Sequence, residues 1–268
     1  MKLKSQILLI FLLLFSTMAF SQINIRGSYS ITSVCKDGII MAADSRGSLY
    51  FDEDNIIAYF DTVQKIFIIK DCIISVTGTM AISNKFISFY LNEFSQYLPN
   101  TTYLPSDLLN EFHKYYCTLY PSLKPDFYKI HLTAARYSNK LPLISVLEQG
   151  SIYSDLYSVA SDTLSEFNNY SSSDLLSKSD DEMGVLMKQC ISNYTNKFNK
   201  HRKIGGPIMI LKVAPDNSIT WRENMPTKEN WDSVDEVYSD YLKGKVKFIF
   251  TKPETESEFR NWLLNSRK

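Results

Sequence analysis

Residues 27–46 read GSYSITSVCKDGIIMAADSR, and this stretch decides the fold. Residues 28–35 are rich in β-branched and aromatic side chains, which favour a strand. Lys36-Asp37-Gly38 is typical of a tight turn, because its glycine can adopt a positive φ. Residues 39–43 form a short apolar run, the pattern of a fully buried strand. The stretch therefore predicts a hairpin in the core of a sheet.

Two polar residues mark the ends of this hairpin. Ser28 opens the first strand directly after a glycine, and Asp44-Ser45-Arg46 closes the second. In these features the chain resembles proteasome β subunits, which are N-terminal-nucleophile (Ntn) hydrolases. Asp44 follows Ser28 by 16 residues, the spacing between nucleophile and acid in that family. The resemblance covers about Gly27 to Glu223 and implies that Ser28 performs catalysis.

The resemblance implies a mechanism that starts with cleavage between Gly27 and Ser28. A serine hydroxyl is a weak nucleophile until a base takes its proton. The amine freed on Ser28 would supply that base, because the usual pKa of an α-amino group, roughly 7.7–8, lies near working pH. A glycine before the serine leaves room for the hydroxyl to attack the glycine carbonyl. An ordinary serine at the start of a strand is the simpler alternative.

The other site residues also follow from the resemblance. Asp44 ends an apolar strand, where an unpaired carboxylate is costly, so it needs a buried cation. Lys65, in Val-Gln-Lys-Ile, matches the catalytic lysine of the family and would assist deprotonation of Ser28. A surface salt bridge is the alternative for Lys65. Gly78 or Thr79 matches the backbone donor of the oxyanion hole, and a plain turn glycine is the alternative there.

Several positions differ from the family pattern. The nucleophile is serine instead of threonine, and the connection over residues 47–62 is about five residues longer than usual. A Gly-Ser-Gly segment of the family appears as Ala160-Ser161-Asp162, and its later Asp-Ser pair as Asn168-Asn169. These groups orient the free amine in the family. The differences leave a second hypothesis open, a catalytically silent scaffold or binding subunit.

The order of the remaining elements supports a layered fold. Residues 47–61 read as a polar and aromatic connection, and residues 154–164 as a possible continuation of the sheet. The predicted order along the chain is strands, two helices, strands, a helix and a strand. This order suits two sheets flanked by helices and does not suit a doubly wound βα alternation. The predicted class is α+β, a four-layer αββα sandwich. The predicted strands are 67–69, 72–76, 131–137, 141–148, 208–213 and 246–251, and the predicted helices are 81–97, 105–120, 179–198, 232–242 and 254–264.

The chain divides into four predicted parts. Residues 1–21 predict a secretory signal peptide, because Lys2 and Lys4 precede an apolar run and Ala19-Phe20-Ser21 offers a small-x-small cut. An uncleaved anchor is the alternative, but the run is short for a bilayer. A spacer or propeptide at 22–27, an Ntn-hydrolase-like domain at 28–225 and a C-terminal extension at 226–268 follow. We therefore expect an exported, periplasmic or secreted, protein.

Composition and motifs limit the classes of partner and cofactor that we expect. A formal net charge of zero gives no basic field for nucleic acid or anionic lipid. No metal-binding, phosphate-binding or G-x-S-x-G motif is present, so no cofactor or metal is predicted. Cys35, Cys72, Cys117 and Cys190 read as free thiols slightly better than as disulfides.

The leading hypothesis is thus an exported hydrolase of amide bonds. Peptides are the favoured substrates, and small amides, as for an acylase, are the alternative. Because members of the resembled family assemble into rings, a homo-oligomer is a further expectation, and no membrane span is expected in the mature chain.

Overall fold

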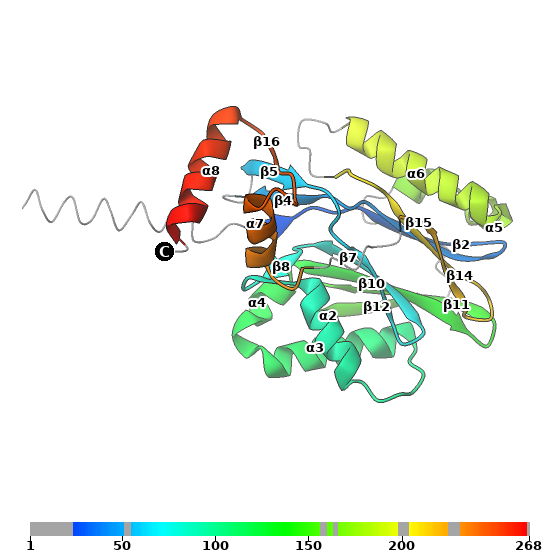
Figure 1. Ribbon diagram of the computed structural model, residues 1–268. Helices are drawn as coiled ribbons and strands as arrows, with labels where there is room; N and C mark the ends of the chain where they lie inside the picture. The colour runs from blue at the N-terminus through cyan, green and yellow to red at the C-terminus, as the bar shows by residue number, and fades with distance from the viewer. Residues whose placement is uncertain are drawn as a thin grey trace, which may run out of the picture.

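The computed structural model describes residues 24–50, 55–155, 160–162, 166–197, 204–224 and 231–266. The predicted signal peptide lies outside these residues. Two five-stranded sheets face each other at the centre of the molecule, and helices cover the outer face of each (Figure 1).

The first sheet contains the hairpin predicted from residues 28–43. Its order is β13-β2-β3-β14-β15, with bounds Ala160–Asp162, Ser30–Cys35, Gly38–Ala43, Met209–Val213 and Ile219–Glu223. All neighbours are antiparallel, and β2 and β3 pair from Ser30↔Ala43 to Cys35↔Gly38. The first strand begins two residues later than predicted, so Ser28 lies just before the strand.

The second sheet is also antiparallel. Its order is β12-β11-β10-β7-β6, with bounds Ser151–Asp155, Leu141–Glu148, Ile130–Ser138, Cys72–Gly78 and Ile66–Ile69. The predicted continuation of the sheet over residues 154–164 is confirmed only for residues 154–155, which end β12. Residues 160–162 instead form β13 in the first sheet.

Helices form the two outer layers. The second sheet is covered by α2 (Ile87–Tyr97) and α3 (Pro105–Leu119), which lead into η1 (Pro121–Leu123) and α4 (Lys124–Phe127). The first sheet is covered by α5 (Ser172–Ser177) and α6 (Asp180–Lys197), after the short η2 (Glu166–Asn169). The predicted four-layer αββα sandwich is confirmed.

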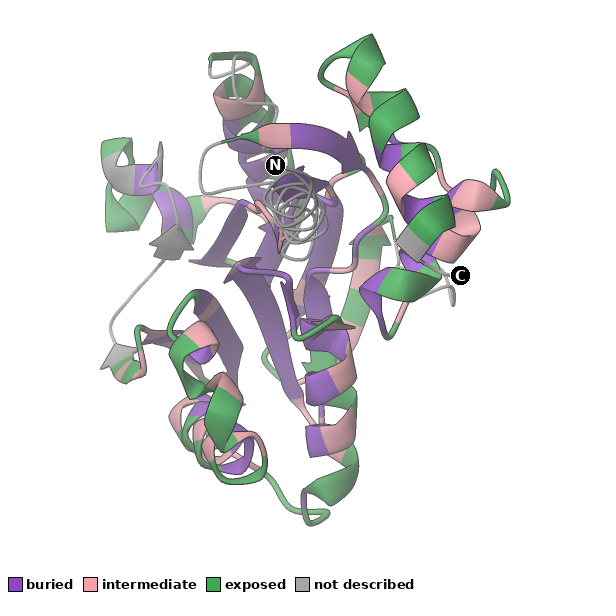
Figure 2. Ribbon diagram, turned by 90° about the vertical axis from the view of Figure 1, so that its left-hand side faces the viewer, coloured by how far each residue is buried: buried purple, intermediate pink, exposed green. Residues whose placement is uncertain are grey.

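Strand alternation sorts the core into layers, because successive side chains of a strand point to opposite faces. In β3, Ile39, Met41 and Ala43 pack between the two sheets, whereas Ile40 and Ala42 pack under α6. The strands of the facing sheets are mostly buried, and many of the exposed positions lie on the helices and in the loops (Figure 2). The hairpin that carries the candidate site is therefore held rigidly from both faces.

A third sheet was not predicted. It has the order β1-β4-β5-β16, with bounds Asn24–Arg26, Gly47–Tyr50, Ile56–Phe60 and Ile249–Phe250. The prediction of residues 47–61 as a connection is wrong, because β4 and β5 form a paired hairpin there. Residues 24–26 of the predicted spacer pair with β4, and Ile25 is fully buried.

The helix predicted over 81–97 begins six residues late. Residues 81–86 form the small hairpin β8 (Ala81–Ile82) and β9 (Lys85–Phe86). Ser83 and Asn84, at its turn, have φ values of 48° and 66°. Two consecutive positive φ angles are typical of a hairpin turn and are incompatible with a right-handed helix.

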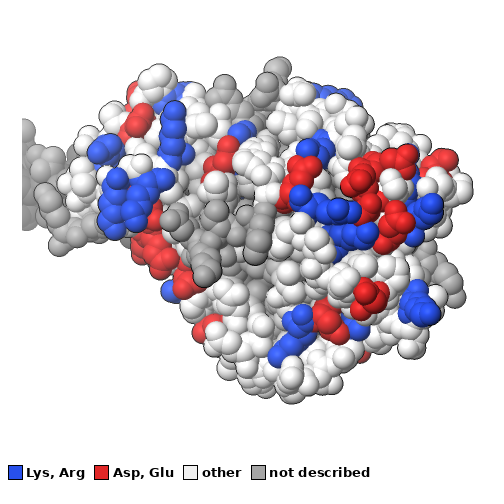
Figure 3. All heavy atoms as spheres, turned by 45° about the vertical axis from the view of Figure 1, so that its right-hand side comes forward, with Lys and Arg blue, Asp and Glu red and all other residues white. Residues whose placement is uncertain are grey.

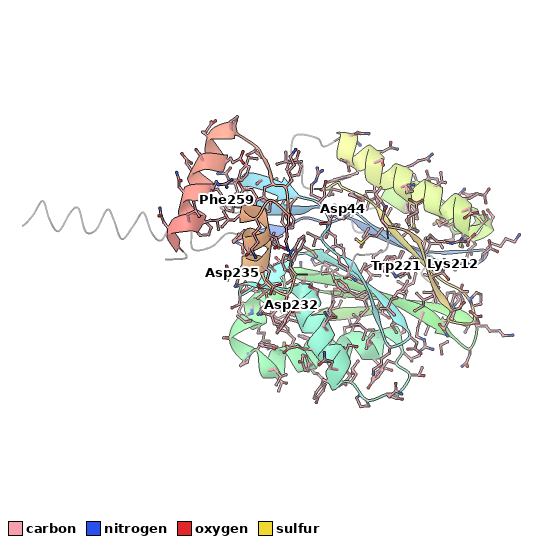
Figure 4. The ribbon with its side chains drawn as sticks, viewed as in Figure 1. Asp44, Lys212, Trp221, Asp232, Asp235 and Phe259 are labelled. Carbon is pink, nitrogen blue, oxygen red and sulfur yellow. The ribbon has the colours of Figure 1, made fainter. Side chains whose placement is uncertain are left out.

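The C-terminal residues pack against the third sheet. They form α7 (Val234–Leu242), β16 and α8 (Pro253–Ser266). Phe259, labelled in Figure 4, is fully buried in α8, and its ring lies 5.8 Å from that of Phe248. Phe248 also contacts Phe60 of β5, with the ring centroids 5.2 Å apart. The extension is thus joined to the third sheet through an aromatic cluster.

Charged side chains of both signs lie close together on the face seen in Figure 3. Asp180 at the start of α6 pairs with Lys212 and Arg222, and Lys188 pairs with Glu223. Within the described residues, no helix is both long and apolar enough to cross a membrane, and no group of three His, Cys, Asp or Glu residues could hold a metal ion. All four cysteines lie within the described residues, and none of them forms a disulfide bond there.

Candidate active site

Asp44 lies in the interior, directly after β3 (Figure 4), and is fully buried. Four donors surround its carboxylate. Oδ1 accepts from Tyr29 N at 2.8 Å and from Lys65 Nζ at 2.8 Å. Oδ2 accepts from Gly205 N at 2.9 Å and from Arg46 N at 3.2 Å. Because a buried carboxylate is tolerated only when it is paired and hydrogen-bonded, this set of donors holds Asp44 in one orientation.

Lys65 lies just before β6, and its side chain is also fully buried. Its ammonium has three N–H groups, and three acceptors surround it. These are Asp44 Oδ1 at 2.8 Å, the Gly27 carbonyl at 2.9 Å and the Arg46 carbonyl at 2.6 Å. Burial lowers the pKa of Lys65, and the charge of Asp44 opposes that shift. Asp44 and Lys65, which the sequence analysis paired, therefore form a buried ion pair.

Ser28 is half-buried between β1 and β2. Its Oγ lies 3.4 Å from the Val76 carbonyl, to which it donates a long hydrogen bond. The ion pair holds the peptide groups on both sides of Ser28, because Lys65 donates to the carbonyl before it and Asp44 accepts from the N–H after it. These two contacts fix the Ser28 backbone relative to the ion pair.

Gly78 ends β7 with a φ of +85°, and a Cβ there would lie 2.4 Å from the Lys129 carbonyl. The N–H of Thr79 donates to that same carbonyl at 3.0 Å. The N–H of Val76 donates to Lys65 O on the opposite edge of β7, and N–H groups two residues apart in a strand point to the same edge. Gly78, and not Thr79, therefore turns its N–H toward the side of the candidate site.

Two features of the site were missed from the sequence. The first is Gly205, whose N–H donates to Asp44 and where a Cβ would lie 2.7 Å from the Arg46 guanidinium. The second is the ion pair of Arg46 with Asp61, in which Nε and Oδ1 are 2.8 Å apart. The Gly205-Gly206 pair is the signal that could have indicated a close backbone approach.

The Ala160–Asp162 segment forms β13 and pairs with β2, from Ala160↔Ser33 to Asp162↔Ile31. The side chains of this segment and of Asn168 lie outside the described residues, and Asn169 is exposed. The prediction that residues 160–162 and 168–169 lack the groups that orient a free amine is therefore not tested by these contacts.

A cleft of about 370 Å³ lies beside the Arg46–Asp61 pair. The cleft is lined by Asp61 and Thr62 together with C-terminal residues that include Trp231, Asp240 and Ile249. The volume is within the range that small-molecule sites occupy, roughly 300–1,000 Å³. The C-terminal residues thus contribute to the surface next to the candidate site.

No known protein-family profile matches this chain, and no curated protein matches it. The chain is similar to a solved structure, the Anbu (Gly-1) mutant from Hyphomicrobium sp. strain MC1, with a TM-score of 0.54 and 14% sequence identity. The match covers 81% of this chain and 96% of that chain. At this identity the similarity concerns the fold alone, and it agrees with the layer order described above. The chain has the fold of the proteasome-like Ntn hydrolases.

Proposed function

We propose that the protein is an Ntn hydrolase of amide bonds, with Ser28 as nucleophile after cleavage of the Gly27–Ser28 bond. One observation carries the proposal. The buried pair of Asp44 and Lys65 holds both peptide groups that flank Ser28. A buried ion pair gives little net stability compared with an apolar replacement, so its place around one serine favours a role in chemistry.

Self-processing would begin at the Gly27 carbonyl, which accepts from Lys65 at 2.9 Å. The ammonium polarises this carbonyl and stabilises negative charge on its oxygen. Attack by Ser28 Oγ transfers the acyl group from nitrogen to oxygen, and water then hydrolyses the ester. The C–N bond is replaced by a Gly27 carboxylate and a free amine on Ser28.

The free amine would then act as the base for later turnovers. Lys65 keeps the surroundings of Ser28 Oγ positive, Asp44 holds Lys65, and the Gly78 N–H is the proposed oxyanion donor. We propose peptides as substrates, since the chain's own peptide bond is the first one offered to the site, with small amides as the alternative. Export through residues 1–21 and assembly into a homo-oligomer are parts of the same proposal.

The test is the N-terminus of the purified mature protein, measured by intact mass and N-terminal sequencing. We expect a chain that begins at Ser28, and we expect Ser28→Ala to retain residues before it. Over a long incubation, an electrophilic peptide probe should add its mass to the chain that begins at Ser28 and not to Ser28→Ala. Ser28→Thr is the matched control, because it keeps the hydroxyl and should be processed.

A second candidate function is a silent scaffold with this fold. It is favoured by β1, because the residues just before Ser28 form a paired strand with the fully buried Ile25. On this hypothesis the mature chain keeps residues 24–27, and Ser28→Ala changes its mass only by the one oxygen atom lost and leaves its activity unchanged. N-terminal sequencing therefore separates the two candidates directly.

A further inference from the structure

The strand before Ser28 is bound on both of its edges. On one edge it pairs with β4 through Asn24↔Tyr50, Ile25↔Leu49 and Arg26↔Ser48. The other edge contacts the chain that follows β7.

On this second edge, the N–H of Met80 donates to Ile25 O at 2.9 Å, and the N–H of Gly27 donates to Gly78 O at 3.3 Å. Arg26 and Thr79 form an isolated bridge between these two bonds. Residues 24–27 therefore occupy a slot between β4 and residues 78–80, and a central strand position of this kind leaves few backbone groups for water.

Side chains also anchor the strand. Ile25 is fully buried in the same apolar cluster as Leu49, Ile57 and Met80. The Arg26 guanidinium lies over the ring of Tyr50, 5.8 Å from its centroid. These contacts do not involve the Gly27–Ser28 bond, so cutting that bond leaves all of them in place.

We propose that the segment ending at Gly27 stays bound in this slot after cleavage, as a separate strand that occupies the active site. This inference rests on the proposed function for the cut itself. Hydrolysis adds one water, breaks the Gly27–Ser28 C–N bond, and leaves a carboxylate on Gly27 and an amine on Ser28. The new carboxylate forms next to Lys65 Nζ, now 2.9 Å from the Gly27 oxygen. A charge-assisted contact is stronger than the contact to a neutral carbonyl.

The C-terminal residues stabilise the strand β4, which forms one side of the slot. β16 pairs with β5, and β5 pairs with β4, the strand that holds β1. The ring of Phe60 in β5 packs against Phe248 and Trp231. This bracing keeps β4 in place, so that the slot does not open when the covalent link to Ser28 is lost.

The test compares native and denaturing mass spectrometry of the purified full-length protein after extensive dialysis. We expect two masses under denaturing conditions, the chain from Ser28 and the segment ending at Gly27, and one native mass equal to their sum. In Ile25→Asp, which places a charge in the apolar anchor, we expect the native mass of the chain from Ser28 alone and at least a tenfold higher peptidase rate. Ile25→Val is the matched control and should retain the segment.

Two results would overturn the inference. If the cut wild type shows only the chain from Ser28 in the native spectrum, the segment leaves, and the proposed cleavage still stands. If the chain is uncut, the proposed function fails, and the slot is tested with a fluorescent peptide of residues 22–27 added to full-length Ile25→Asp. Saturable binding to this variant and not to the wild type supports a strand-accepting slot, and lack of binding refutes it.

Discussion

Replacing Lys65 by methionine removes the charge that Asp44 contacts but keeps a side chain of similar length. Both groups of the pair have fully buried side chains, and breaking such a pair typically costs about 3–5 kcal/mol. The carbonyls of Gly27 and Arg46 also lose a donor, which adds roughly 1 kcal/mol each. Three backbone N–H groups still stabilise the carboxylate. We therefore expect the free energy of unfolding to fall by about 4 kcal/mol.

Urea unfolding at pH 7 measures this loss. For a domain of this size, about 4 kcal/mol corresponds to a fall in Tm of roughly 8–16 °C. The matched control is Lys114→Met, because Lys114 pairs with Glu111 at the surface, with exposures of 61% and 44%. That substitution should change stability by less than about 0.5 kcal/mol.

A double-mutant cycle with Asp44→Asn isolates the interaction itself. Since removal of both charges leaves neither one buried alone, we expect the double variant to be more stable than the sum of the single changes by about 2–3 kcal/mol. A loss of less than about 1 kcal/mol in Lys65→Met, or simple additivity in the cycle, would refute the buried, coupled pair and with it the geometric basis of the candidate site.

Three further predictions concern other parts of the fold. Gly78→Ala should lower the free energy of unfolding in urea by about 2–3 kcal/mol and abolish any amidase activity, because φ is +85° and the new Cβ would lie 2.4 Å from the Lys129 carbonyl. Gly184→Ala is the control: Gly184 lies in a helix, a Cβ there would be 3.8 Å from its nearest neighbour, and the free energy of unfolding should rise by about 0.5–1 kcal/mol. Burial raises the pKa of Tyr137 from 10.0 to about 12. Between pH 10.0 and about pH 12, the unfolded chain therefore loses a proton that the folded chain keeps. The free energy of unfolding should fall in this range by up to about 1.4 kcal/mol per pH unit. Urea midpoints against pH should be flatter for Tyr137→Phe and unchanged for the exposed Tyr153→Phe. Phe259→Ala should cost about 3–5 kcal/mol, and amide exchange should quicken in β16 and β5.

The sequence predicted the two central sheets because their strands carry strong local signals. Residues 39–43 are apolar throughout and lie between two buried layers, so the hairpin and the separation between Ser28 and Asp44 could be derived before the structure. A buried carboxylate needs a cation, so a basic partner for Asp44 could be expected. The resemblance to proteasome β subunits, and not the residue pattern alone, indicated that this partner is Lys65.

The third sheet could not be predicted in the same way. Its strands are short, and β1 has only three residues, so no periodicity of two is visible in them. Their stability comes from partners far away in the chain, such as the pairing of Tyr59 with Ile249. The helix start at Ile87 was missed for a different reason. The apolar spacing of residues 81–86 suits a helix, and the left-handed turn at Ser83 and Asn84 prevents it.

The intact chain also explains why cleavage and activity are separate steps in the proposed function. With Gly27 in place, all three N–H groups of Lys65 have acceptors, and an ammonium without a free donor cannot bind a further oxygen. Departure of Gly27 removes one of these acceptors, and the released N–H then points toward the position that the Gly27 carbonyl held. A substrate carbonyl can use this donor only after the segment has left. The rate at which β1 leaves its slot, and not the chemistry at Ser28, would then determine how much active enzyme is present.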